Sequence, residues 1–268
     1  TLHKYGIRIG RQQEGDDLTL NIAKAAGHIA LQGATRSGKS VTSYAILSQC
    51  ATDPKIEVWG IDPTGVLLSP WRDHPGKRVC GLEHLDHCVE VIDQAVNEMS
   101  LRLHDLDYQG VDKIEPDTST PALLMVLEEW PATLKALKDG DLGLKTAEKR
   151  EGRVRAGVSR LIAEGAKVGI KVMMIAQRFD ASIIGGAERS NIAYRITHRV
   201  DNGDAVRMLH PIATPELVDT VTGFQPGRAL AEWPGENPAI FQADLIEYQD
   251  YAQRVRQATR KTRIGRQA

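Results

Sequence analysis

Gly33-Ala-Thr-Arg-Ser-Gly-Lys-Ser40 follows the spacing G-x-x-x-x-G-K-[ST] of a phosphate-binding loop. In such a loop the glycines allow backbone N–H groups to surround the phosphates, while the lysine reaches the outer phosphates and the final hydroxyl ligates Mg²⁺. Lys39 and Ser40 hold these two positions. The stretch therefore predicts a site for ATP and Mg²⁺. The residues expected to contact ATP are Gly33, Ala34, Thr35, Arg36, Ser37, Gly38, Lys39, Ser40 and Val41.

The sequence on both sides of this loop supports the prediction. Residues 28–32 (HIALQ) are short and mostly apolar, as in a buried strand, and residues 41–50 place apolar side chains at helical spacing. The phosphates would then lie at a helix N-terminus, where the helix dipole favours anions. A chance match on a glycine-rich turn is the alternative, and it explains neither flank.

An acidic pair follows another buried strand. Residues 123–127 (LLMVL) are entirely apolar and end at Glu128 and Glu129. Parallel strands end at one edge of a sheet, so these carboxylates should face the phosphates, with Glu128 in the Mg²⁺ shell and Glu129 polarising the attacking water. The alternative is the acidic first turn of a helix. Gln177 also follows an apolar strand, and its amide is a candidate to sense the γ-phosphate or to orient water.

The rest of the chain predicts an α/β fold with a mainly parallel sheet. Strands are expected over residues 55–62, 170–176 and 192–198, and the apolar spacing predicts a helix over 89–106. We expect a small β lead-in over 1–25, an ATPase core over 26–250 that closes with a β-hairpin near 227–243, and a basic C-terminal helix or tail over 251–268.

Composition sets limits on these predictions. The chain has 268 residues, 41% of them hydrophobic and 26% charged, which suits one large domain and argues against a second full one. No apolar run approaches the ~20 residues of a membrane helix. The chain begins with Thr1, so we expect a cytoplasmic fragment whose full-length protein is a candidate for a membrane anchor. The net charge of −1 excludes a uniformly basic surface but leaves room for a local basic channel.

Three cysteines give no paired disulfide framework and fit a reducing compartment. Cys80, His84, His87 and Cys88 resemble a metal site at first sight. Because Cys88 directly follows His87, their side chains point apart, and the spacing favours a solvated helix start over zinc.

Several short motifs follow one another along the whole chain. They are His28 before the first core strand, the loop from Gly33 to Ser40, Ile61-Asp-Pro63, Asn97-Glu-Met99 with Arg102, Gly169-Ile170, Ala176-Gln-Arg178, Asn191-Ile192 with Arg195-Ile196, and Pro226-Gly-Arg-Ala229. In these motifs and their order, the chain resembles the FtsK/SpoIIIE family of ring-forming DNA translocases over essentially its whole length.

The resemblance implies a RecA-like P-loop ATPase core that hydrolyses ATP at the subunit interfaces of a homo-oligomeric ring, expected to be a hexamer, and moves double-stranded DNA. It also implies an arginine supplied by a neighbouring subunit, for which Arg160 and Arg195 are candidates, with a structural ion pair as the alternative for each. The family's usual Asp-Glu pair is Glu128-Glu129 here, which leaves the role of Glu128 less certain. The chain looks like the motor portion of a conjugative-element or phage member.

DNA is expected to contact basic loops that line the ring. The segment 145–155 is the densest basic stretch before the C-terminal tail, and the segment 178–189 follows Gln177. Phosphate contacts without base reading suit a translocase. The alternative for 145–155 is a solvated helix face. The candidate DNA contacts are Lys145, Lys149, Arg150, Arg153, Arg155 and Arg189.

Three other classes of protein remain open. The first is a secretion ATPase of the same family, which would move a polypeptide. The second is a small-molecule kinase, which is disfavoured because no lid segment is recognised and because the acidic pair suits water activation. The third is a passive nucleotide switch.

Overall fold

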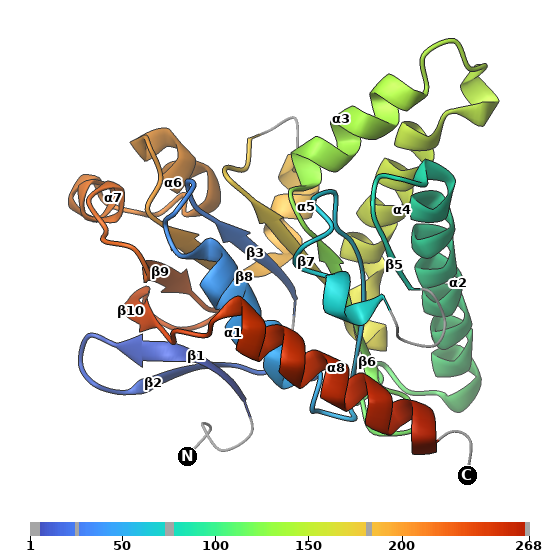
Figure 1. Ribbon diagram of the computed structural model, residues 1–268, viewed down its shortest axis with the longest axis horizontal. Helices are drawn as coiled ribbons and strands as arrows, with labels where there is room; N and C mark the ends of the chain where they lie inside the picture. The colour runs from blue at the N-terminus through green and yellow to red at the C-terminus, as the bar shows by residue number, and fades with distance from the viewer. Residues whose placement is uncertain (1–5, 25–26, 73–77, 181–183, 266–268) are drawn as a thin grey trace.

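The computed structural model describes residues 6–24, 27–72, 78–180 and 184–265. These residues form one ten-stranded sheet in the order β2-β1-β10-β9-β8-β3-β7-β6-β4-β5 (Figure 1). The strands from β8 to β5 are parallel, and those from β9 to β2 are antiparallel. The strands are β1 (Ile7–Gln12), β2 (Asp17–Leu20), β3 (His28–Gln32), β4 (Ile56–Ile61), β5 (Val79–Cys80), β6 (Ala122–Leu127), β7 (Ile170–Ala176), β8 (Ile192–His198), β9 (Arg228–Glu232) and β10 (Ala239–Ala243).

Helices cover both faces of this sheet. On one face α1 and α8 pack with the short helix η2, and on the other α2, α3 and α4 pack together (Figure 1). A smaller apolar cluster joins α6 and α7 to the start of the antiparallel strands. The helices are α1 (Lys39–Cys50), α2 (Leu85–Gln109), α3 (Trp130–Gly140), α4 (Arg150–Glu164), α5 (Gly186–Asn191), α6 (Gly203–Leu209), α7 (Pro215–Thr222) and α8 (Tyr248–Gly265), with the 3-10 helices η2 (Ser69–Trp71), η3 (Thr146–Glu148) and η4 (Gly165–Val168).

The parallel half confirms the predicted α/β fold. Its central strands β3, β7, β6 and β4 are buried and almost entirely apolar, because helices cover both of their faces. The N-terminal strands extend the same sheet, since β1 pairs with β10 of the C-terminal hairpin. The expected boundary at residues 25–26 lies outside the described residues.

One helix is longer than expected, and the C-terminal segment takes the helical one of its two expected forms. The helix predicted over 89–106 runs from Leu85 to Gln109 and stops where Gly110 adopts a left-handed φ of 66°. That conformation suits glycine and ends a helix. The C-terminal segment is a packed helix: the Tyr251 ring is fully buried and stacks on Tyr44 of α1 at 4.9 Å, while its hydroxyl donates to the Leu67 carbonyl.

His28 owes its place in the fold to the sheet. Its Nδ1 accepts a hydrogen bond from the Val172 N–H and its Nε2 donates to the Ile162 carbonyl, both at 2.9 Å. The imidazole therefore joins the start of β3 to β7 and to α4. Burial lowers the pKa of His28 to about 4, so this buried ring stays neutral near pH 7.

Cys80 and Cys88 place their sulfur atoms 3.1 Å apart, and both thiols are buried. Among the described residues, no three His, Cys, Asp or Glu side chains are arranged to hold a metal ion. No helix in the described part of the chain has the length and apolar character needed to cross a bilayer.

Candidate active site

The fold brings three predicted site segments to one edge of the sheet. Strand β7 lies between β3 and β6, with Gln32 level with Ala176 and Leu127 level with Met174. Because these strands are parallel, the phosphate-binding loop, Gln177 and the acidic pair all begin at their carboxyl ends. Polar groups meet here without interrupting the apolar strands.

The loop from Gly33 to Ser40 has the backbone that its sequence predicts. Gly38 adopts a φ of 110° and caps α1, so α1 begins at Lys39 with its first N–H groups open to the loop. Arg36 also has a positive φ, 62°, which is rare for a residue with a side chain. Thr35, Arg36 and Ser40 are exposed on the surface where phosphates would lie.

Two contacts from distant segments support this loop from within the protein, and only one of them involves a residue of a recognised motif. His198, the last residue of β8, is fully buried, and its Nε2 lies 2.8 Å from the Thr42 hydroxyl on α1. The Gly227 N–H, just before β9, donates to the Ser37 carbonyl at 2.8 Å. Pro226-Gly-Arg-Ala229 was recognised as a family motif, and its contact with the loop gives that motif a structural reason.

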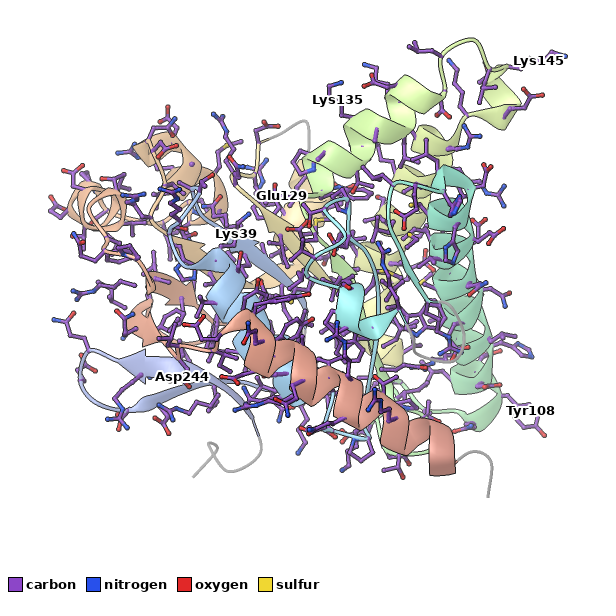
Figure 2. The ribbon with its side chains drawn as sticks, in the orientation of Figure 1. Lys39, Tyr108, Glu129, Lys135, Lys145 and Asp244 are labelled. Carbon is purple, nitrogen blue, oxygen red and sulfur yellow. The ribbon has the colours of Figure 1, made fainter. Side chains whose placement is uncertain are left out.

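Lys39 and Glu129 form an ion pair across the site. Their side chains are largely buried and point toward one another (Figure 2). Glu129 has a φ of 39° and caps α3, a conformation that strains a residue with a side chain. The turn at the end of β6 thus directs the Glu129 carboxylate toward the phosphate-binding loop.

Glu128 faces a second carboxyl group. Burial raises the pKa of Glu128 to about 8, and the carboxylates of Asp62 and Glu129 add to the shift. Glu128 Oε2 is buried and has no hydrogen-bond partner among the described residues. Asp62 follows β4, and its carboxylate accepts bonds from the N–H groups of Thr64, Gly65 and Leu68 at 2.8–3.0 Å.

Asp62 was recognised only as part of a family motif. Its position follows the same rule as that of Glu128, since both come directly after a buried parallel strand. An acidic residue at such a strand end is the sequence signal that identifies it. Gln177 follows β7 in the same way and is exposed.

The two candidate arginines each form an ion pair within their own chain. Arg160 is exposed on α4 and pairs with Glu164, one turn further along, at 3.3 Å. Arg195 on β8 is largely buried, and it pairs with Glu232 of β9 at 2.8 Å and donates to the Ile192 carbonyl. The chain therefore satisfies Arg195 internally, whereas Arg160 retains a solvent-facing guanidinium.

The predicted basic segment divides into two kinds of side chain. Arg150 pairs with Asp86 of α2 at 2.6 Å and with the buried Asp141, while Arg153 pairs with Asp93 of α2 at 2.7 Å. Arg155 pairs with Glu151. Within the described chain, Lys145 and Lys149 have no ion-pair partner.

Lys145 lies at the tip beyond α3, far from the edge that holds Lys39 (Figure 2). Arg189 donates to the Ile184 carbonyl at 3.3 Å. The segment expected to be a loop over 178–189 includes the start of α5, and residues 181–183 lie outside the described residues.

Comparison with known proteins gives consistent matches. The model of the FtsK/SpoIIIE family matches residues 3–181. The DNA translocase FtsK of Borreliella burgdorferi is 23% identical over 206 residues, and the match covers 72% of this chain but only 24% of that protein. The chain thus spans about a quarter of the length of this curated relative.

Solved structures share the fold. The pCW3 conjugation coupling protein TcpA, a monomer with ATPγS, matches at a TM-score of 0.74 and 20% identity, with 97% of this chain and 71% of that one covered. EssC from Geobacillus thermodenitrificans matches at a TM-score of 0.71 and 19% identity, with 98% of this chain and 49% of that one covered. The cytoplasmic domain of the Type VII secretion ATPase EccC of Thermomonospora curvata matches at a TM-score of 0.67 and 19% identity, with 92% of this chain and 30% of that one covered.

The matched residues include the phosphate-binding loop, both strand-end glutamates and Gln177. The family match and the arrangement of these groups at the carboxyl edge of a parallel sheet agree. The chain belongs to the FtsK/SpoIIIE family and is a P-loop ATPase.

Proposed function

We propose that this chain is the motor of a ring-forming translocase that hydrolyses ATP to move double-stranded DNA through a central channel. The observation that carries the proposal is the pairing of Lys39 with Glu129 beside the buried Glu128. This arrangement provides a phosphate-binding cation, a carboxylate for water and a carboxylate for a metal within one site. Because ATP is its fuel, the motor works on the cytoplasmic side.

The residues present fit Mg²⁺. The orphaned Oε2 of Glu128 is a hard oxygen ligand, and Ser40 supplies a hydroxyl at the exposed end of the loop. Mg²⁺, when bound with ATP, neutralises phosphate charge and raises the reactivity of the γ-phosphate. The raised pKa of Glu128 is consistent with a carboxyl group whose charged form lacks a partner until a cation arrives.

The ion pair between Lys39 and Glu129 suggests how the site is held before ATP binds. Triphosphate attracts the Lys39 ammonium more strongly than one carboxylate does, so ATP draws Lys39 away. Glu129 then becomes available to accept a proton from the attacking water. We assign to Gln177, which directly follows the strand between the two elements, the role of orienting that water or contacting the γ-phosphate.

A neighbouring subunit would complete the site. We assign Arg160 as the stronger candidate for the arginine supplied in trans, because Arg195 is held by Glu232 and by backbone carbonyls of its own chain. A six-membered ring is proposed from the family alone. Lys145 and Lys149, whose charges are unpaired within the described chain, are the preferred DNA contacts in the basic segment.

Movement of a polypeptide is the second candidate function. The fold matches to EssC and to the secretion ATPase EccC support it, although at under 25% identity they establish the fold alone. The match to a DNA translocase in sequence favours DNA.

ATP hydrolysis by the assembled protein, measured with and without long duplex DNA, separates these functions. If the protein is a DNA motor, its rate of ATP hydrolysis should increase with duplex DNA and should not respond to an unfolded polypeptide of equal length. A Glu129→Gln protein is the control for contaminating ATPases. Stimulation by the polypeptide, with none by DNA, would replace DNA with protein as the substrate.

A further inference from the structure

A histidine that belongs to no recognised motif lies directly beneath the phosphate-binding loop. His198 ends β8 and is fully buried. A methyl group added at Gly33 would come within 2.7 Å of His198 Cβ, and one added at Gly38 would come within 3.3 Å of its Cε1. The imidazole therefore contacts the loop near both of its glycines.

The same ring is bonded to the helix that follows the loop. His198 Nε2 and the Thr42 hydroxyl lie 2.8 Å apart and share a hydrogen bond in a buried environment. The Thr42 N–H donates to the Gly38 carbonyl, so Thr42 closes the first turn of α1. Lys39 and Ser40 belong to this turn, and their positions depend on its geometry.

A second support acts on the other side of the loop. The Gly227 N–H holds the Ser37 carbonyl, and a Cβ added at Gly38 would come within 2.6 Å of Gly227 N. The loop is thus fixed at Ser37 by the start of β9 and at Thr42 by the end of β8. Burial also lowers the pKa of His198 to about 4, which keeps the ring neutral beside the Lys39 ammonium.

We propose that His198 is a positioning residue for nucleotide binding: through Thr42 it holds the phosphate-binding loop and the first turn of α1 in the shape that receives the phosphates. A loop that is already ordered binds its ligand without the entropy loss of ordering it afterwards. The proposal rests on the proposed use of this loop for ATP.

The test is a double-mutant cycle on the binding of Mg·ATPγS, measured by isothermal titration calorimetry. One net hydrogen bond contributes about 1 kcal/mol, so His198→Ala and Thr42→Val should each raise the Kd roughly fivefold. Together they should raise it no more than either does alone, because both remove the same bond. His198→Gln, whose amide can bond to Thr42, and Thr42→Ser should recover most of the affinity.

The chain offers a matched control. His28 is also buried, but it lies at the start of β3, the end of that strand opposite to the loop, and it bonds to the Val172 N–H and to the Ile162 carbonyl at 2.9 Å. His28→Ala should lower the melting temperature without raising the Kd for Mg·ATPγS. Should His198→Ala fail to fold, Thr42→Val and Thr42→Ser carry the comparison.

The proposal is overturned if folded His198→Ala and Thr42→Val bind within twofold of the unchanged protein, or if their effects multiply. It is also overturned if His28→Ala weakens binding as much as His198→Ala does. The failure of duplex DNA to stimulate hydrolysis would contradict the proposed function and leave these binding ratios unaffected.

Discussion

The edge of the sheet around the phosphate-binding loop and the surface of α4 both contain charged residues, but the two regions differ in how these residues are paired. At the sheet edge, Glu128 is buried with an orphaned oxygen, and Lys39 is paired with the catalytic candidate Glu129. On α4, Arg150 and Arg153 are matched by acids of the neighbouring helix α2. Unmatched buried charge indicates a ligand site, whereas matched surface charge indicates packing between helices.

Loss of the Glu129 carboxylate should give the largest effect. Glu129→Gln retains the shape of the side chain but removes the base, so ATP hydrolysis should fall about 10³-fold while Mg·ATPγS still binds. Steady-state hydrolysis and calorimetry measure the two quantities. Glu148→Gln, at an exposed position on η3, is the control. A Glu129→Gln protein that hydrolyses ATP at the normal rate would refute the catalytic assignment.

Removing the Glu128 carboxylate should stabilise the nucleotide-free fold but impair ATP hydrolysis. Its folded pKa, about 8, lies above the ordinary 4.5, so its contribution to stability is complete below pH 4.5 and is lost as pH rises through 8. Glu128→Gln should therefore raise the melting temperature of the nucleotide-free protein by several degrees at pH 8.5, and less at pH 5.5, while lowering hydrolysis. An equal change at both pH values would contradict the burial argument.

The basic segment should show the smallest effects and separate its two kinds of side chain. Arg150→Ala leaves the buried Asp141 without its cation and should lower the melting temperature by a few degrees. Lys145→Ala with Lys149→Ala should leave the melting temperature unchanged and weaken DNA binding. The slope of log Kd against log salt concentration should also become shallower, by the amount expected for about two fewer phosphate contacts.

The division of the basic segment into paired and unpaired side chains would be contradicted if the substitutions at Lys145 and Lys149 changed the melting temperature and not DNA binding. Arg153→Ala serves as the internal control, because the surface ion pair between Arg153 and Asp93 should contribute little to stability.

Much of the fold and the nucleotide site was predictable because the relevant signals are local. The loop from Gly33 to Ser40 needs particular backbone angles that its glycines supply, and apolar runs such as 123–127 identify buried strands directly. The polar residues that follow such strands must meet at one edge, since the strands are parallel. These predictions depend on few long-range contacts.

The missed features depend on contacts between distant segments. Arg150 and Asp86 are 64 positions apart, so the pairing that occupies this arginine arises only when α4 packs on α2. The contact of His198 with Thr42 spans 156 positions. The start of α2 at Leu85 carries no side-chain cap, so no capping residue in the sequence marks where that helix begins.

Displacement of a third strand from a linear DNA triplex tests the central claim most directly. A ring that hydrolyses ATP at the Lys39–Glu129 site and travels along duplex DNA should displace the third strand when ATP is present, and the Glu129→Gln ring should not. Active hydrolysis by an assembled ring, with no displacement on any duplex, would contradict the account.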